Sequence, residues 1–301
     1  MDEYVWGHAD ELVPLLAAFD AAAEEGHITR AAHDLGIPQS TLSRRIRAVE
    51  NVLGVALFQP VGRGVALTPQ GREFHERTRG VLRALEDAAA AVRSNADPDS
   101  GLVRFGFPLT LGPVSIPALL ADFHRSAPRV RLHLVQAHGE DLVDRIRAGN
   151  LDLAVVIPAP EDLPTTRLGH QEIRAVVPRG HRLAGRRRVA LGDLAGEPFV
   201  ANPPTYHLRR QLDSWCAEAG FSPRVVFEIT EFETLRSLVA HGLGVALLPD
   251  AETEHTDLVS IRLDGKRRRT IGLVTGGHRP TPAVDRLRRH LEERFATTGG
   301  W

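Results

Sequence analysis

The segment that most constrains this 301-residue chain is ITRAAHDLGIPQSTLSRRIRAVENVLG, residues 28–54. It holds two short helical patterns joined at Gly36, and glycine tolerates the positive φ that a sharp turn between helices requires. Apolar residues of the second pattern recur at helical spacing and predict one buried face; they are Leu42, Ile46, Val49 and Leu53. Another helical stripe, over residues 12–26, precedes this pair. The segment therefore predicts a helix-turn-helix.

The opposite face of the second helix carries one amide together with hydroxyl and guanidinium groups. Its residues are Gln39, Ser40, Thr41, Ser43, Arg44 and Arg47. Gln and Arg side chains can bind base edges, whereas Ser and Thr can bind phosphates or bases. A solvated helix face is the alternative, but residues 57–68, LFQPVGRGVALT, predict a strand, a turn and a second strand. Arg63 stands at the tip of this hairpin, where an arginine can enter a narrow minor groove. These features predict a winged helix-turn-helix DNA-binding domain over residues 1–67.

The charge of the whole chain argues against DNA binding until it is examined locally. The formal net charge is −1, so the molecule is not a polycation. Residues 26–72, however, hold six arginines against two acids, and residues 1–25 hold seven acids and no Lys or Arg. A basic region beside an acidic one is typical of a protein that contacts a polyanion with one face only.

Cysteine usage and hydropathy limit the classes of protein to which the chain can belong. Cys216 is the single cysteine, which excludes an intrachain disulfide and a thiolate metal cluster, and we expect it in or near a core. The acidic N-terminus does not resemble a secretory signal. The longest apolar stretch, residues 238–249, is too short to span a bilayer. We therefore expect a cytoplasmic protein without membrane contact.

A long helix is predicted after the hairpin, over residues 68–97. Thr68 supplies an N-cap and Pro69 the first helical position. Apolar or small residues then recur at alternating spacings of four and three, the pattern of a coiled-coil seam: Phe74, Thr78, Val81, Leu85, Ala88 and Val92. The same stripe could instead pack on the helix's own domain. Residues 95–101, NADPDSG, mark the break before the next domain.

The second part of the chain, residues 101–301, has an α/β pattern. Residues 102–157 alternate strand and helix as β-α-β-α-β, which predicts a parallel sheet. Further strand candidates are EIRAVVP, PFVA, RVVFEIT and VALLP, and the tail adds the strand TIGLVT and a final helix. The predicted fold class is α/β, with a second α/β lobe after the first and a return of the tail to the first lobe.

Three loops at predicted strand ends are candidate ligand contacts, because ligands of open parallel sheets bind beyond the carboxyl ends of strands. They carry Pro108, Leu109 and Thr110, then Thr205 and Tyr206, then Glu231 and Phe232. Exposed amides and hydroxyls there favour a carboxylate or similar anion. Glu231 would instead favour an amine or a hydroxyl-rich ligand, and ordinary helix capping is the alternative for each residue taken singly.

Signatures of catalysis or of a resident cofactor are not found. The sequence has no phosphate loop, nucleophile elbow, zinc-protease motif or dinucleotide fingerprint. Among fourteen histidines, His124, His133 and His138 lie near one another in sequence, but we expect scattered positions rather than a metal site. Residues 265–270, GKRRRT, are expected to form a solvated turn before a strand. We expect no enzyme activity and no cofactor.

Residues 17–74 resemble the winged helix-turn-helix of LysR-type transcriptional regulators almost position for position. The family's serine-glutamine-proline at the start of the recognition helix appears here as Pro38-Gln39-Ser40. Gln39, Ser43 and Arg44 match positions that the family uses on DNA, and Thr29 matches one commonly placed near phosphate.

The resemblance extends, more loosely, through GLVRFGFPLTLGPVSIPALL, DLVDRIRAGNLDLAVV, VALGDLAGEPFV and LRSLVAHGLGVALLP. It implies two lobes like those of a periplasmic solute-binding protein. The first is expected at about 101–160 and 269–301, the second at about 161–268, with crossing segments near 158–166 and 262–270. It further implies a dimerising linker helix at 68–97, a homodimer that assembles to a homotetramer, an operator with dyad symmetry, and a small-molecule effector bound between the lobes.

Two rival functions come from other classes. A solute-binding component would carry an export signal and no DNA-binding module, and the sequence has the reverse. A catalytic α/β protein with an accessory N-terminal module predicts turnover by residues 101–301. The sequence favours a DNA-binding transcriptional regulator over both.

Overall fold

A computed structural model describes residues 9–62, 64–94, 100–277 and 280–298. The chain divides into two compact units, residues 1–90 with 148–150 and residues 91–147 with 151–301. Among the described helices, none is both long and apolar enough to cross a membrane.

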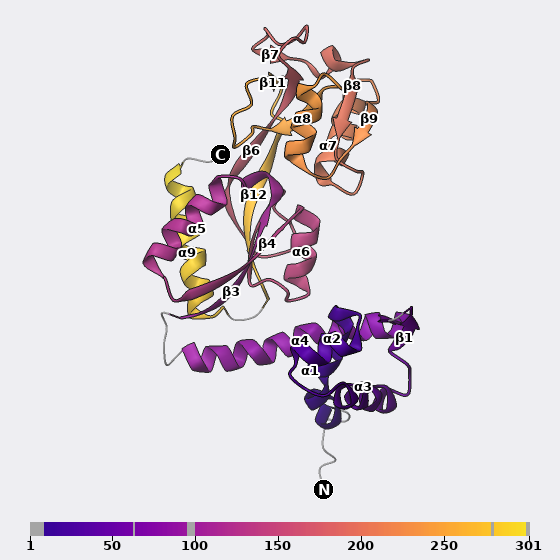
Figure 1. Ribbon diagram of the computed structural model, residues 1–301. Coiled ribbons are helices and arrows are strands. Elements are labelled where there is room, and N and C mark those ends of the chain that lie inside the picture. The colour runs from indigo at the N-terminus through magenta and orange to yellow at the C-terminus, as the bar shows by residue number, and fades with distance from the viewer. Residues whose placement is uncertain (1–8, 63, 95–99, 278–279, 299–301) are drawn as a thin grey trace. The chain divides into compact units, whose positions relative to one another are not determined.

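Helices and one hairpin make up the first unit (Figure 1). Its elements are α1 (Ala9–Glu25), α2 (Ile28–Asp34), α3 (Gln39–Leu53), β1 (Phe58–Val61), β2 (Gly64–Leu67) and α4 (Pro69–Ser94), the last turn of which belongs to the second unit. Gly36, between α2 and α3, has a φ of 64°, and Gly54 ends α3 with a φ of 70°. The predicted helix-turn-helix is therefore present, with glycine at both positions that need a left-handed backbone.

The core of this unit forms where α3 meets α1 and α2. Leu42, Ile46 and Val49 of α3 are buried, as their spacing predicts. On α2, Ala31 and Ala32 are 0% and 2% exposed, and their small side chains let the two helices approach closely. The fully buried ring of α1, Phe19, belongs to the same core as Val49.

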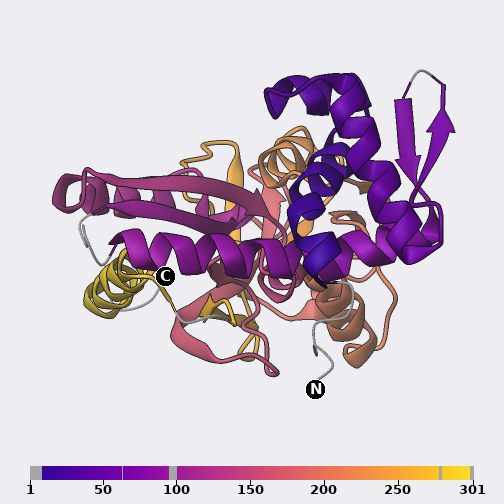
Figure 2. The same cartoon turned by 90° about the horizontal axis from the view of Figure 1, so that it is seen from below.

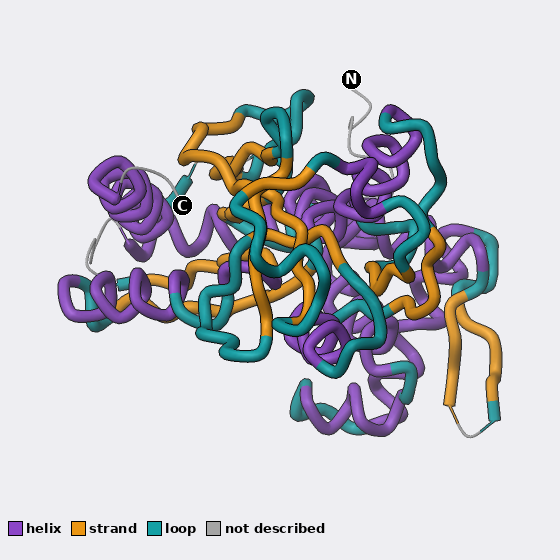
Figure 3. Tube along the Cα trace, turned by 90° about the horizontal axis from the view of Figure 1, so that it is seen from above, coloured by secondary structure: helices purple, strands orange, loops and turns teal. Residues whose placement is uncertain are grey.

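The hairpin β1–β2 follows α3 and pairs antiparallel from Phe58 opposite Leu67 to Val61 opposite Gly64. Figure 2 shows it beside the helices of this unit, and Figure 3 shows its two strands in orange. The amide of Val65 donates to the carbonyl of Gly26 at 2.9 Å, which ties the hairpin to the turn before α2. The predicted wing is thus attached to the helix-turn-helix through backbone contacts.

Helix α4 begins at the predicted cap. Thr68 Oγ1 accepts from the amide of Gly71 at 3.0 Å and donates to the carbonyl of Ala56 at 2.8 Å. The expected seam is only partly available to a partner, because Phe74 packs inside its own unit with its ring centroid 5.2 Å from that of Phe19. Farther along the helix the apolar side chains are uncovered: Val81, Leu85 and Val92 are 54%, 57% and 72% exposed.

The second unit has two lobes. The first is built from β3 (Gly101–Pro108), α5 (Ser115–Ser126), β4 (Val130–Ala137), α6 (Gly139–Arg147), β5 (Leu153–Val156), β12 (Arg268–Thr275) and α9 (Pro282–Thr298). The second contains β7 (Arg188–Val189), β8 (Pro198–Ala201), α7 (His207–Glu218), β9 (Arg224–Glu228), α8 (Phe232–Ala240), β10 (Ala246–Pro249) and β11 (Leu258–Leu263). Strand β6 (Thr165–Pro178) belongs to both.

One large sheet has the strand order β4-β3-β5-β12-β6-β11-β7. The predicted parallel pairing holds for β4, β3 and β5. Beyond these three strands, which are the ones the prediction covered, the sheet is mixed, because β12 runs antiparallel to both β5 and β6. The chain enters the second lobe along β6 and returns along β12, so the two strands shared by the lobes run in opposite directions.

Separate apolar cores fill the two lobes. In the first lobe, α5 and α9 cover one face of the sheet and α6 covers the other (Figure 1). In the second lobe, β10 and β11 pair antiparallel with the far half of β6, while β8 and β9 form a short parallel pair. Cys216 of α7 is fully buried in this second core, as expected. The candidate ligand contacts lie on loops between the two cores.

Candidate functional sites

The polar face of α3 is open to solvent. Gln39, Ser40, Arg44 and Arg47 are exposed, whereas Thr41 and Ser43 are partly buried. Hydrogen bonds order part of this face: Gln39 Nε2 donates to Ser43 Oγ at 3.1 Å, and Arg44 Nη2 reaches Thr41 Oγ1 at 3.5 Å. The helix thus presents amide, hydroxyl and guanidinium groups together.

The cations of this face lack acidic partners. Among the described residues, Arg44, Arg45 and Arg47 form no ion pair. The single acid of α3, Glu50, turns away, since its Oε1 accepts from the amides of Leu57 at 2.8 Å and Phe58 at 3.2 Å. Three unpaired guanidinium groups on one helix form a surface suited to phosphate oxygens.

Two of the predicted DNA contacts, Thr29 and Arg63, lie outside α3. Thr29 is exposed in the first turn of α2. Its neighbour Arg30 is already occupied, with its Nε 3.2 Å from a carboxylate oxygen of Glu25. Arg63, predicted at the wing tip, lies outside the described residues.

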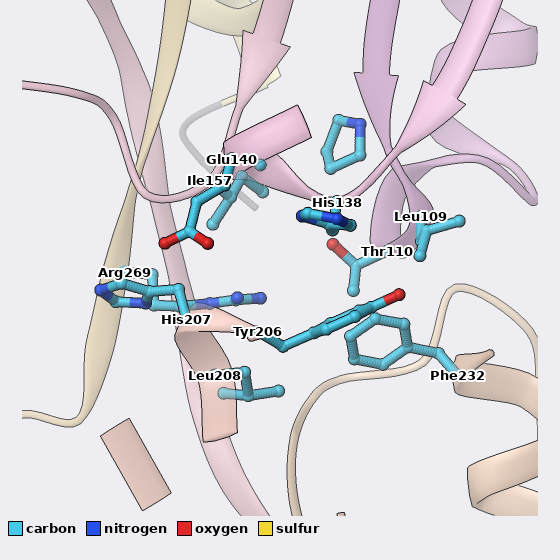
Figure 4. Close-up of a pocket in the computed structure, with 12 residues that line it drawn as sticks. Leu109, Thr110, His138, Glu140, Ile157, Tyr206, His207, Leu208, Phe232 and Arg269 are labelled. Atoms are coloured by element: carbon cyan, nitrogen blue, oxygen red, sulfur yellow. The ribbon is translucent and has the colours of Figure 1, made fainter. Parts of the chain in front are cut away.

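A pocket lies where the two lobes of the second unit meet (Figure 4). We call it the Arg269 pocket; it is lined by Pro108, Leu109, Thr110, His138, Gly139, Glu140, Ile157, Tyr206, His207, Leu208, Phe232 and Arg269. Its cavity volume is about 30 Å³, far below the roughly 300–1,000 Å³ of sites that hold small organic ligands. A hollow of about 400 Å³ shares Gly139, Glu140 and His207 with it.

Arg269 is the charged centre of this pocket. It is 6% exposed, and its Nη2 donates to Gln171 Oε1 at 2.5 Å, while Gln171 Nε2 donates to Thr110 Oγ1 at 3.2 Å. Burial lowers the pKa of Arg269 to about 10. Among the described residues no carboxylate pairs with it, and its Nε has no hydrogen-bond partner. The expectation of a solvated turn at 265–270 is therefore wrong for this residue, because β12 begins at Arg268 and turns the next side chain inward.

The remaining polar groups of the pocket lie at the N-terminal ends of α6 and α7, with His138 and Tyr206 directly before the two helices. The rings of His138 and Tyr206 lie 4.8 Å apart between centroids. Burial and the nearby charges of Arg269 and Arg210 lower the pKa of His207, so this imidazole is held neutral. Glu140 forms an ion pair with Arg210, which links the first lobe to the second beside the pocket.

The structure brings most of the predicted ligand contacts together. Pro108, Leu109, Thr110, Tyr206 and Phe232 line the Arg269 pocket. Thr205 is exposed and does not line it.

Glu231 lies at the N-terminus of α8, where its carboxylate accepts from the amides of Glu233 at 2.8 Å and Thr234 at 2.5 Å. Partial burial acts to raise its pKa, but these backbone hydrogen bonds prevail and lower it. Glu231 therefore caps α8, which is the alternative role that the sequence left open for it.

Several lining residues are absent from the sequence prediction. His138 and Glu140 follow the end of β4, which lies parallel to β3, so the strand-end rule that selected Thr110 applies equally to them. Arg269 alternates in phase with Ile271 and Leu273, both buried, and this period of two is the signal of an inward position. His124, His133 and His138 were expected to be scattered and not to form a metal site. Of these three residues, only His138 lines the pocket.

Comparison with known proteins identifies both units. Residues 14–72 match the family described as a bacterial regulatory helix-turn-helix protein, lysR family, and residues 96–296 match the LysR substrate binding domain. The HTH-type transcriptional regulator YybE of Bacillus subtilis is 31% identical over 286 residues, which cover 93% of this chain and 98% of that protein. The hydrogen peroxide-inducible genes activator of Escherichia coli O6:H1 is 31% identical over 261 residues, covering 84% of this chain and 86% of that protein.

Among solved structures, a full-length OxyR variant from Pseudomonas aeruginosa has a TM-score of 0.73 at 24% identity, covering 94% of this chain and 98% of that one. This likeness supports the fold, and the family matches span both the DNA-binding and the ligand-binding unit. The chain therefore belongs to the LysR family of bacterial DNA-binding transcriptional regulators, with an N-terminal helix-turn-helix domain and a C-terminal effector-binding domain.

Proposed function

We propose that this regulator binds operator DNA through the polar face of α3 and responds to a small organic anion bound in the Arg269 pocket. On DNA, the proposed contacts are Thr29, Gln39, Ser40, Thr41, Ser43, Arg44, Arg47 and Arg63. The absence of acidic partners for the described arginines of α3 supports this role, since a duplex supplies the missing counter-charges. Arg63 is proposed to contact the minor groove or the backbone.

The proposed assembly is a homodimer through α4 that pairs into a homotetramer. Val81, Leu85 and Val92 are uncovered on α4, and Ala88 between them is exposed as well. A second copy would bury this stripe and place two helix-turn-helix domains on an operator with dyad symmetry. We propose three functional parts: a DNA-binding domain at 1–67, a dimerisation helix at 68–97 and an effector-binding domain at 101–301. The protein is proposed to act on DNA in the cytoplasm and to bind its ligand without turnover.

The observation that carries the effector proposal is the buried guanidinium of Arg269. A buried charge without a counter-charge is costly, and a carboxylate can pair with it through two parallel hydrogen bonds. Thr110 and Tyr206 add hydroxyl groups at the same pocket. Since the free space there is about 30 Å³, an anion enters only when the lining side chains or the lobes move apart. Such a movement is the proposed signal to the DNA-binding unit.

A response to peroxide through a thiol, which the name of one relative suggests, is disfavoured. Cys216 is the single cysteine, so no intrachain disulfide can form. Burial, followed by the charge of Asp213, raises the pKa of its thiol to about 12. The reactive thiolate form is therefore scarce near neutral pH.

The proposal is tested with the full chain on a fluorescent duplex from the region upstream of its own gene. Mono- and dicarboxylates of increasing length are added at constant ionic strength, and both affinity and the DNase footprint are measured. At least one acid is expected to change the footprint at a saturable concentration. Equal footprints with all acids, together with a change caused by neutral or cationic analogues, would show that the effector is not an anion.

A further inference from the structure

A second pocket of about 440 Å³ lies between the same two lobes. We call it the Ser115 pocket. It takes Thr110 and Ser115 from the first lobe, Glu172 and Arg174 from β6, and Asp250 and Glu252 from the segment after β10. Thr110 also lines the Arg269 pocket, but Arg269 itself does not line this second one. The volume lies within the range of small-molecule sites.

The charge of the Ser115 pocket is opposite to that of its neighbour. Arg174 Nη2 lies 3.0 Å from Asp250 Oδ2 and 3.5 Å from Glu172 Oε2, so one cation faces two carboxylates. Glu252 contacts no cation in the described chain; its oxygens accept from the amides of Val114 at 2.9 Å and Ser115 at 3.3 Å. Three acids against one arginine leave an excess of negative charge on the lining.

Ser115 supplies an independent indication of a ligand. The residue is 2% exposed, and its Oγ has no hydrogen-bond partner among the described residues. A buried hydroxyl is normally paired, because burying it without a partner costs free energy. Ser115 lines the pocket, so a donor bound there would satisfy the hydroxyl oxygen.

We propose that the Ser115 pocket binds a small organic cation, an ammonium or guanidinium compound. Glu172 and Glu252 supply counter-charges, and Ser115 Oγ accepts a hydrogen bond from the cationic group. Arg174 stays paired with Asp250 and keeps the carboxylates from repelling one another. This second ligand is chemically distinct from the anion of the Arg269 pocket, and its binding does not depend on that assignment.

Calorimetric titration of the full chain with three four-carbon probes tests the proposal. The probes are 1,4-diaminobutane, 1,4-butanediol and succinate, which share a chain length and differ in charge. At fixed low ionic strength only the diamine is expected to bind saturably through this pocket, and its affinity should fall as salt rises. No saturable diamine binding, or equal binding of the diol, would overturn the proposal.

Three variants locate the binding. Glu172→Gln removes one exposed carboxylate of the pocket and should weaken diamine binding about tenfold. Its control, Glu254→Gln, removes an exposed acid that does not line the pocket and should leave the affinity unchanged. Ser115→Ala should weaken diamine binding without lowering the melting temperature of the free protein, because the hydroxyl has no hydrogen-bond partner in the described part of the chain. Diamine binding that is the same in Glu172→Gln and Ser115→Ala as in the wild type would place the cation elsewhere and refute the site.

Discussion

Replacement of Arg269 by methionine separates the stability of this protein from its response to ligand. The guanidinium is buried; among the described residues it meets no carboxylate, and it donates its side-chain hydrogen bond to Gln171. Methionine has a similar length and fills the space without a charge. In the absence of effector we therefore expect the variant to be at least as stable as the wild type, although a buried, hydrogen-bonded side chain has been removed.

The magnitude follows from the pKa and from the hydrogen bond to Gln171. Burial lowers the pKa of Arg269 from 12.5 to about 10, which corresponds to about 3 kcal/mol of unfavourable charge burial. Leaving the oxygen of Gln171 without its donor costs about 1–3 kcal/mol. The difference predicts that the free energy of unfolding rises by about 1 kcal/mol. Binding of an anionic effector should weaken by about 2–3 kcal/mol, or roughly a hundredfold in Kd, because its counter-charge is gone.

Urea unfolding and calorimetric titration on the same preparations measure both effects. Arg268→Met is the matched control, since Arg268 is the adjacent residue of β12 and is exposed; its stability and its ligand affinity should stay near those of the wild type. A loss of more than about 2 kcal/mol in Arg269→Met would refute the reasoning, because it would mean that the charge stabilises the free fold. Undiminished anion binding would remove Arg269 from the site.

Three further predictions concern other parts of the structure. Gly71→Ala should lower the free energy of unfolding by about 1–3 kcal/mol, since a Cβ there would lie 2.0 Å from the carbonyl oxygen of Leu57; Gly80→Ala, in open space on the same helix, should raise it by about 1 kcal/mol, and equal effects would contradict the packing. His207→Gln should lose less stability than the wild type on acidification from about pH 7 to pH 5.5. The lowered pKa of His207 keeps this imidazole neutral in the native state, while the unfolded chain takes up a proton. Parallel curves of unfolding free energy against pH for the two proteins would exclude this residue as the cause. Leu85→Glu should shift the sedimentation coefficient toward that of a monomer with little change in far-UV circular dichroism, and an unchanged coefficient would place the dimer interface elsewhere.

The helix-turn-helix could be predicted from the sequence because local periodicity determines it. Leu42, Ile46 and Val49 fall on one helical face whatever the rest of the chain does, and Gly36 fixes the turn. Phe74 shows the limit of this reasoning. It fits the heptad pattern of α4, yet it packs on Phe19 of its own unit, and spacing alone does not tell which neighbour covers an apolar residue.

Only part of the ligand pocket could be predicted from the sequence, because spacing along the chain does not show which residues meet in the fold. Thr110 and Tyr206 could be predicted because each follows the carboxyl end of a strand, β3 and β8, where ligands of α/β folds bind. The charged centre, however, depends on Arg269 meeting Gln171, 98 residues earlier, through the antiparallel pairing of β12 with β6. The period of two marks Arg269 as an inward position, but only the register of this pairing determines that it meets Gln171.

Anisotropy titration of the assembled protein between about 50 and 200 mM salt measures whether the arginines of α3 bind a duplex. In this range the number of neutralised phosphates dominates the salt dependence of binding. The duplexes are the region upstream of its own gene and a scrambled duplex of equal length. We predict tighter binding to the upstream duplex. Arg44→Ala should abolish this preference and flatten the plot of log K against log salt by about 0.9 for each phosphate that the variant no longer neutralises, whereas Arg30→Ala, which removes an arginine already paired with Glu25, should do neither. Equal affinity for the two duplexes, with Arg44→Ala indistinguishable from the wild type, would contradict the claim.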